Sequence, residues 1–78
     1  MPRFFFHIYD DGIARDADGR DFPDAEAAKR EAIKGARELM CEQVREGRLA
    51  LNHRVEIEDD TGNRVATLRF GDLVQIES

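Results

Sequence analysis

The stretch AEAAKREAIKGARELMCEQVRE, residues 25–46, decides the fold because it is long and strongly amphipathic. Asp24 precedes it and can cap the first turn, and Gly47 follows it and suits the left-handed conformation in which helices often end. The segment therefore predicts one helix over residues 25–46. Its apolar residues recur at steps of three and four and form a single stripe. The stripe consists of Ala25, Ala28, Ala32, Ala36, Leu39, Met40 and Val44.

Residues 3–9, with the sequence RFFFHIY, are aromatic and β-branched and predict a strand. Side chains alternate across a strand, so Phe4, Phe6 and Ile8 share one wholly apolar face. We expect the helix to pack on this face. The N-terminal half of the helix is rich in alanine, and small side chains let a helix sit close to a sheet that carries bulky phenylalanines.

The rest of the chain supplies three shorter strand patterns separated by turn residues. They are residues 13–16, 54–59 and 64–70. Together the patterns predict a single α+β domain over residues 1–78 with a two-layer ββαββ arrangement. With a right-handed crossover through the helix, we expect a four-stranded antiparallel sheet in the order 2-1-3-4, with 2-1-4-3 as the alternative. In the connection after the helix, Leu49 and Leu51 are expected to tuck under the helix end.

The composition of the chain limits the functions that we expect of it. A chain of 78 residues buries only about 60% of its extended-chain surface, so burial against a partner would stabilise it. The net charge of −5 argues against indiscriminate binding to nucleic acid or to anionic membranes. The single cysteine excludes an internal disulfide, and the N-terminal residues match neither a signal peptide nor a membrane span. We therefore expect a cytoplasmic protein that does not associate with membranes.

Since one helix covers only one face of such a sheet, the opposite face is the first candidate site. Aromatic residues there could stack on nucleic-acid bases, but Glu56 and Glu58 share the face and RNA-binding motifs are missing. Burial against a second copy is the less demanding explanation. We therefore expect a homodimer, or a complex with another protein. The residues expected at this contact are Phe5, His7, Tyr9, Val65, Thr67 and Arg69.

A basic strip on the polar side of the predicted helix is the second candidate surface. Such a strip could contact nucleic-acid phosphates, and a neighbouring strip of glutamates could pair with it along a solvated helix. The second interpretation is simpler, so binding to nucleic acid is the alternative to self-association. The strip consists of Arg30, Lys34, Arg37 and Arg45.

Metal binding is not expected. The three aspartates within residues 16–21 do not match a calcium loop, because an arginine stands at the fifth position and the glycine comes too early. A solvated turn explains them better. His7 and His53 could meet beside Asp10 or Glu56, but no short ligand spacing supports a metal site.

Catalysis is not expected either. Cys41 lies outside the apolar stripe and should be accessible to solvent, and Arg37 and Arg45 on either side would favour its thiolate. No base, oxyanion hole or resolving cysteine accompanies it. Phosphate-binding loops and hydrolase or zinc-protease motifs are also missing. We expect a non-enzymatic protein without a cofactor.

The motifs MPRFFFH, DG, DxxGRDFPDAEAAKREA and LRFGD resemble a family of small bacterial proteins with a domain of unknown function, found mainly in alphaproteobacteria such as rhizobia. The resemblance spans almost the whole chain. It implies a cytoplasmic bacterial protein and supplies no activity or catalytic residue. The ββαββ arrangement is also similar to HicB-like antitoxin domains, which back a small sheet with one helix. The leading expectation is an interaction module with a regulatory or accessory role; the alternative is a nucleic-acid-binding or antitoxin-like protein.

Overall fold

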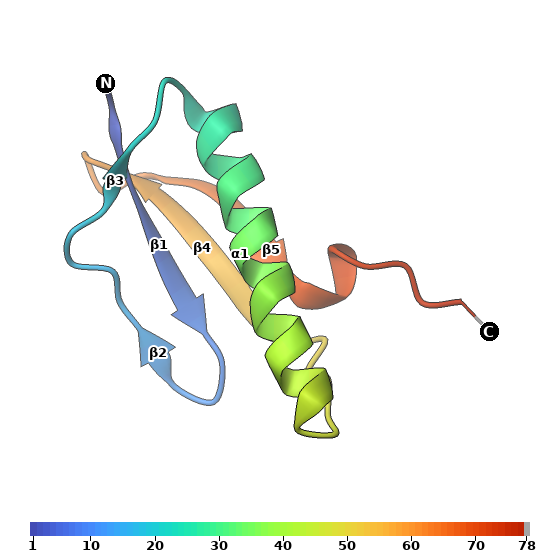
Figure 1. Cartoon of the computed structure of the whole chain (residues 1–78). Coiled ribbons are helices and arrows are strands. Elements are labelled where there is room, and N and C mark those ends of the chain that lie inside the picture. Colours follow the sequence, from blue (N-terminus) through green and yellow to red (C-terminus); the bar gives the residue numbers. More distant parts are fainter. Residues whose placement is uncertain (78) are drawn as a thin grey trace.

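The computed structural model describes residues 1–77. One long helix lies across one face of an antiparallel sheet, and the C-terminal residues extend away from it (Figure 1). The elements in chain order are β1 (Arg3–Tyr9), β2 (Ile13–Ala14), β3 (Arg20–Asp21), α1 (Ala25–Arg45), β4 (Arg54–Asp59), β5 (Arg64–Arg69) and the 3₁₀ helix η1 (Phe70–Asp72). The expected α+β class, with one helix and an antiparallel sheet, is confirmed.

Strand β1 lies inside the sheet. One of its edges pairs with β4, and β4 pairs in turn with β5, so the main path runs β2-β1-β4-β5. The other edge of β1 pairs with β2 near its end and with β3 near its start. The expected four-stranded ββαββ arrangement is therefore wrong in detail. The segment over residues 16–21, predicted as a turn only, also contains β3, because Arg20 and Asp21 extend along the free edge of β1.

The predicted capping residues flank the helix at both ends. The Asp24 side chain accepts a hydrogen bond from the backbone N–H of Ala27 at 2.8 Å, which satisfies one donor of the first turn. The last helical residue is Arg45, one position before the expected end. Gly47 follows with φ +83°, a left-handed conformation that glycine adopts without a steric cost.

The N-terminal half of α1 closes the core. Ala28, Ala32 and Ala36 are buried, and the core cluster that contains them also includes Phe4 and Ile57. Phe6 and Ile8 are partly buried and pack against the same cluster, so the helix covers the face of β1 that was expected.

Phe22 is partly buried and packs against the core, which the sequence did not indicate. Its ring lies 5.7 Å from that of Phe6 and 6.2 Å from that of Phe4, measured between centroids. Phe70 was expected to end the last strand. It instead opens η1, and it is almost fully buried.

The C-terminal half of α1 departs from the predicted stripe. Val44, expected in the core, is 59% exposed, while the polar Gln43 is buried in its place. Leu49 and Leu51, expected under the helix end, are 37% and 43% exposed. The last turns of α1 extend past the start of β4 (Figure 1), and the connection after the helix packs there on Gln43, whose side chain contacts His53 and Ala50. Gln43 therefore takes the inward position, and Val44 faces solvent.

Candidate functional site

The sheet face opposite the helix is partly covered by the chain itself. His7, expected at a contact surface, is buried, and its Nδ1 accepts a hydrogen bond from the backbone N–H of Asp16 at 3.0 Å. Its Nε2 lies 3.3 Å from a carboxylate oxygen of Glu58. Both ring nitrogens are therefore engaged within the molecule, which gives His7 a structural role.

Asp16 holds in place the loop over residues 15–19, which joins β2 to β3 and is called the covering loop below. Its carboxylate accepts hydrogen bonds from the backbone N–H groups of Phe6, Asp18 and Gly19. Burial opposes the charged form, but these donors together lower the pKa of Asp16 below its ordinary value. Gly19, with φ +69°, fits closely over Phe5, because a Cβ atom there would stand 2.8 Å from the Phe5 ring.

The other expected contact residues are divided between two environments. Tyr9 is half-buried, with the guanidinium of Arg54 lying 4.1 Å from its ring centroid. Val65, Thr67 and Arg69 on β5 are exposed. The structure thus brings the six expected residues to one face but leaves only those of β5 open to solvent.

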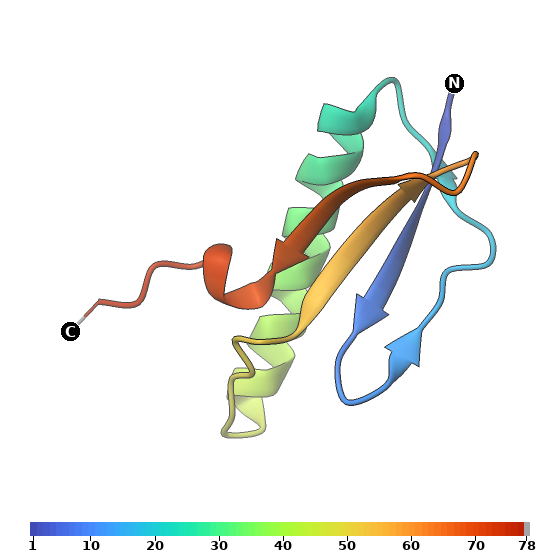
Figure 2. The same cartoon turned by 180° about the vertical axis from the view of Figure 1, so that it is seen from behind.

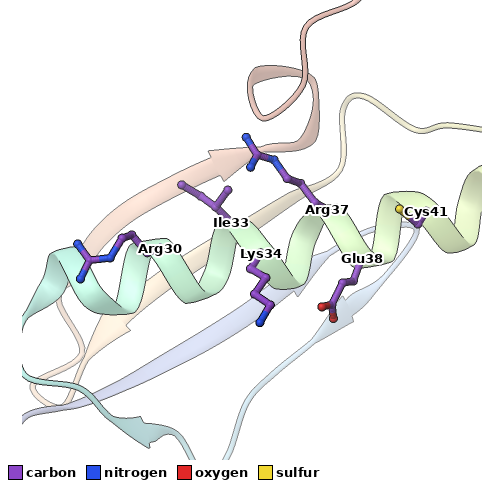
Figure 3. A pocket seen from close by; sticks show the side chains of 6 residues that line it. All are labelled: Arg30, Ile33, Lys34, Arg37, Glu38 and Cys41. Atoms are coloured by element: carbon purple, nitrogen blue, oxygen red, sulfur yellow. The ribbon is translucent and has the colours of Figure 1, made fainter.

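The basic strip of α1 is brought together only in part. Arg37 donates from Nε to the backbone carbonyl of Leu73 at 3.0 Å, and Arg45 pairs with Glu42 at 2.9 Å. A hollow of about 480 Å³ lies along the outer side of the helix. Figure 3 shows the side chains that line it. Its lining residues are Arg30, Ile33, Lys34, Arg37, Glu38 and Cys41, so Arg45 lies outside it. Cys41 is exposed, as expected.

An apolar groove lies beside this strip, where α1 meets the residues that follow η1. Its volume is about 580 Å³. Arg37, Cys41 and Arg45 line it from the helix side. Its apolar lining consists of Met40, Val44, Leu49, Val74 and Ile76. Val44 and Ile76 are 59% and 67% exposed. The sequence did not reveal this groove, because the periodicity placed Val44 in the core.

The two histidines do not meet. His53 packs on the helix side, with Nδ1 3.2 Å from the side-chain nitrogen of Gln43 and its ring against the edge of Phe70, whereas His7 lies on the opposite face. Gln43 also accepts a hydrogen bond from the backbone N–H of Ala50, so it joins the helix end to the connection. Within residues 1–77, no group of three or more histidine, cysteine or acidic residues is arranged to hold a metal ion.

These features define a small α+β domain with a groove at one end of its helix. The chain matches the family model of the domain of unknown function DUF6894 over residues 3–71, and it belongs to that family. The matched region contains β1 to β5 and α1, while Val74 and Ile76 of the groove follow it. Curated proteins and solved structures provide no match to this chain. No helix in the described part of the chain combines the length and apolar character needed to cross a membrane.

Proposed function

We propose that this protein is a non-enzymatic interaction module that self-associates, in a regulatory or accessory role in the bacterial cytoplasm, and that a second copy docks in the apolar groove. The observation that carries the proposal is the exposure of two large apolar side chains, Val44 and Ile76, that line one groove. Large apolar side chains gathered on one surface of a small domain are typical of a contact site.

The free energy available from this groove suits a weak dimer. Full burial of one Val or Ile side chain contributes roughly 1.5–3 kcal/mol. Since Val44 and Ile76 already lose part of their exposure in the monomer, the four side chains of two copies would contribute roughly 4–8 kcal/mol. Association costs at least about 4 kcal/mol in lost freedom, so the groove alone would give a dissociation constant no tighter than about 1 mM. We expect contacts around the groove to contribute roughly a further 4 kcal/mol, which brings the dissociation constant into the micromolar range.

Charge complementarity favours a second copy as the occupant. Arg37 and Arg45 line the helix side of the groove. Glu77 directly follows Ile76, which lines its other side. In a two-fold contact, the helix of each copy faces the C-terminal segment of the other. Arg37 and Arg45 of one groove would then lie near Glu77 of the partner copy.

The sheet face is a weaker docking surface than was expected from the sequence. The covering loop packs on Phe5 and engages His7, and Arg54 lies over Tyr9. The basic strip is also a weaker nucleic-acid surface, because Arg37 is held by Leu73. The sheet face remains the alternative contact that the following experiment can identify.

Sedimentation equilibrium on the intact chain tests the proposal. We expect a dimer at micromolar concentration for the wild type and a monomer for Val44→Glu and for Ile76→Glu. Both positions are more than half exposed, so neither change should unfold the monomer. The matched control is Val65→Glu, which places the same charge at an exposed valine of the sheet face and should leave the dimer intact.

Two results would contradict the proposal. A wild type that remains monomeric up to about 1,000 μM rules out self-association of useful strength. A dimer that dissociates in Val65→Glu or Phe5→Glu but survives in Val44→Glu would place the contact on the sheet face instead.

A further inference from the structure

A polar hollow lies on the sheet face opposite the helix, over β4 and β5, which Figure 2 shows from that side. Its volume is about 600 Å³. Three arginines line it, Arg54 from β4 and Arg64 and Arg69 from β5. The hydroxyl of Thr67 and the amide of Asn52 provide further hydrogen-bond donors. We call this site the arginine hollow.

The register of the two strands places like charges opposite each other. Arg54 is the direct cross-strand partner of Arg69. Like charges in this position destabilise a sheet unless something neutralises them. Arg54 is neutralised, since its Nε lies 2.8 Å from a carboxylate oxygen of Glu56. Among residues 1–77, Arg69 has neither an ion pair nor a side-chain hydrogen bond, so its charge is open to a ligand.

Glu56 organises the hollow rather than filling it. Its side chain is only 10% exposed, and it also lies 3.7 Å from Arg64. The hydrogen bond from Arg54, followed by the charges of both arginines, lowers the pKa of Glu56 despite its burial, so the carboxylate stays ionised at neutral pH. One carboxylate thus pairs with both guanidinium groups, closely with that of Arg54 and more distantly with that of Arg64.

The charge of the hollow is opposite to that of the whole molecule. Three arginines face the two carboxylates of Glu56 and Asp72, which leaves a local excess of one positive charge on a protein of net charge −5. An arginine cluster on an acidic protein concentrates small anions at that cluster. Guanidinium groups bind phosphate oxygens in pairs with a geometry that an ammonium group cannot reproduce.

We propose that the arginine hollow binds the phosphate group of a small phosphorylated molecule, with Arg69 and Thr67 making the main contacts and Arg54 completing the site. The hollow is larger than a phosphate ion, which leaves room for the remainder of such a molecule. A nucleic-acid backbone presents the same chemical group, and the experiment below separates the two sources.

Titration of the ¹⁵N-labelled protein with inorganic phosphate and with glycerol phosphate, followed by amide chemical shifts, tests the proposal. We expect saturable shifts at residues 54, 67 and 69, and none with sodium chloride at equal ionic strength. Arg69→Gln should weaken binding at least about tenfold, because a hydrogen bond to a charged group contributes that much. Arg69→Lys keeps the charge but loses the paired geometry, so it should weaken binding by a smaller factor.

Arg30→Gln is the matched control, because it removes one positive charge from the exposed outer surface of α1. It should bind phosphate as the wild type does. Equal weakening by Arg30→Gln and Arg69→Gln would mean that net charge alone attracts the anion and would overturn the proposal. Shifts confined to the helix around Arg30 and Lys34 would overturn it as well.

A single-stranded oligonucleotide titration separates the phosphate sources. Tighter binding per phosphate than glycerol phosphate, with shifts that spread beyond the hollow, would overturn the small-molecule ligand in favour of nucleic acid. The proposal is independent of self-association. Val44→Glu alters the groove and not the hollow, so it should lose the dimer and keep the phosphate-induced shifts.

Discussion

The two halves of α1 have the same apolar periodicity and different surroundings. In the N-terminal half, Ala28 and Ala32 are buried, with exposed fractions of 0% and 4%. In the C-terminal half, Val44 is 59% exposed although it continues the same stripe. The difference arises because the last turns extend past β4 (Figure 1), where the connection after the helix binds the polar Gln43 in place of Val44. An apolar stripe therefore predicts the inward side of a helix where a sheet covers it, but not where a polar loop contact replaces the sheet.

The stability of the monomer should show this difference most strongly. Ile57 on β4 is fully buried in the core that α1 closes, so Ile57→Ala should lower the free energy of unfolding by about 2–5 kcal/mol. Val44→Ala should change it by less than about 0.5 kcal/mol. Urea unfolding near 1 μM protein, where a micromolar dimer largely dissociates, measures both. A loss above about 1 kcal/mol for Val44→Ala would show that the open half of the helix is packed.

Overpacking the alanine-rich N-terminal half of α1 should have a smaller effect on stability. Ala32→Leu adds volume between helix and sheet and should cost about 1–3 kcal/mol. Gly35, three residues further along, is the control, because a Cβ atom there would meet nothing within 4 Å. Gly35→Ala should therefore stabilise the helix by about 0.5–1 kcal/mol. Thermal unfolding compares the two variants, and stabilisation by Ala32→Leu would mean that the helix stands further from the sheet.

The covering loop shields part of the sheet face opposite the helix from solvent. Asp16→Asn exchanges one carboxylate oxygen for a nitrogen that cannot accept the N–H of Phe6, so it should cost about 1–2 kcal/mol at pH 7, reduced by the partial exposure of the loop. Since folding lowers the pKa of Asp16 from 3.8, its contribution is present above about pH 4 and is lost as the pH falls through the folded value.

Urea midpoints at pH 7 and at pH 3 check this prediction. The wild type and Asp16→Asn should differ at pH 7 and approach each other at pH 3, because protonation weakens the same acceptor in the wild type. A difference that stays constant over this range would mean that the carboxylate charge contributes nothing to the loop.

Local patterns predicted the elements of the fold better than the exposure of its surfaces. The cap at Asp24, the glycine at position 47 and the alternation in β1 all depend on neighbouring residues, so the sequence contains enough information to predict them. The pairing of β3 and the burial of Phe22 depend on contacts between distant segments. Alternation also predicted the face of His7 but not its burial. The loop at Asp16 covers that face, and the alternation in β1 contains no information about this loop.

The candidate sites also depend on contacts between segments that are distant in the sequence. The sequence indicated Thr67 and Arg69 as surface residues and missed their neighbour Arg54, because only the strand register shows that Arg54 and Arg69 are opposite each other. The groove was missed for a different reason. Its lining combines Val44 with Ile76, which is separated from Val44 by the whole second hairpin. Periodicity within one helix contains no information about such a contact.

The smallest predicted effect concerns Cys41, which lies in the open half of the helix and lines the groove. In the monomer its thiol is exposed, so a maleimide reagent should label it promptly under native conditions. A second copy docked in the groove would cover it. For a dimer with a dissociation constant of about 10 μM, mass action leaves about a fifth of the chains monomeric at about 100 μM protein. The labelling rate should then fall about fivefold between dilute and concentrated protein.

Val44→Glu distinguishes this protection from a general effect of concentration, because the monomeric variant should react at one rate throughout. Protection that persists in Val44→Glu would show that something other than the groove contact covers the thiol. A constant rate in a wild type that sedimentation shows to be dimeric would place the dimer contact away from the helix. The open half of α1 would then have no partner in the dimer, and the exposed fraction of Val44 would have to be explained by another protein.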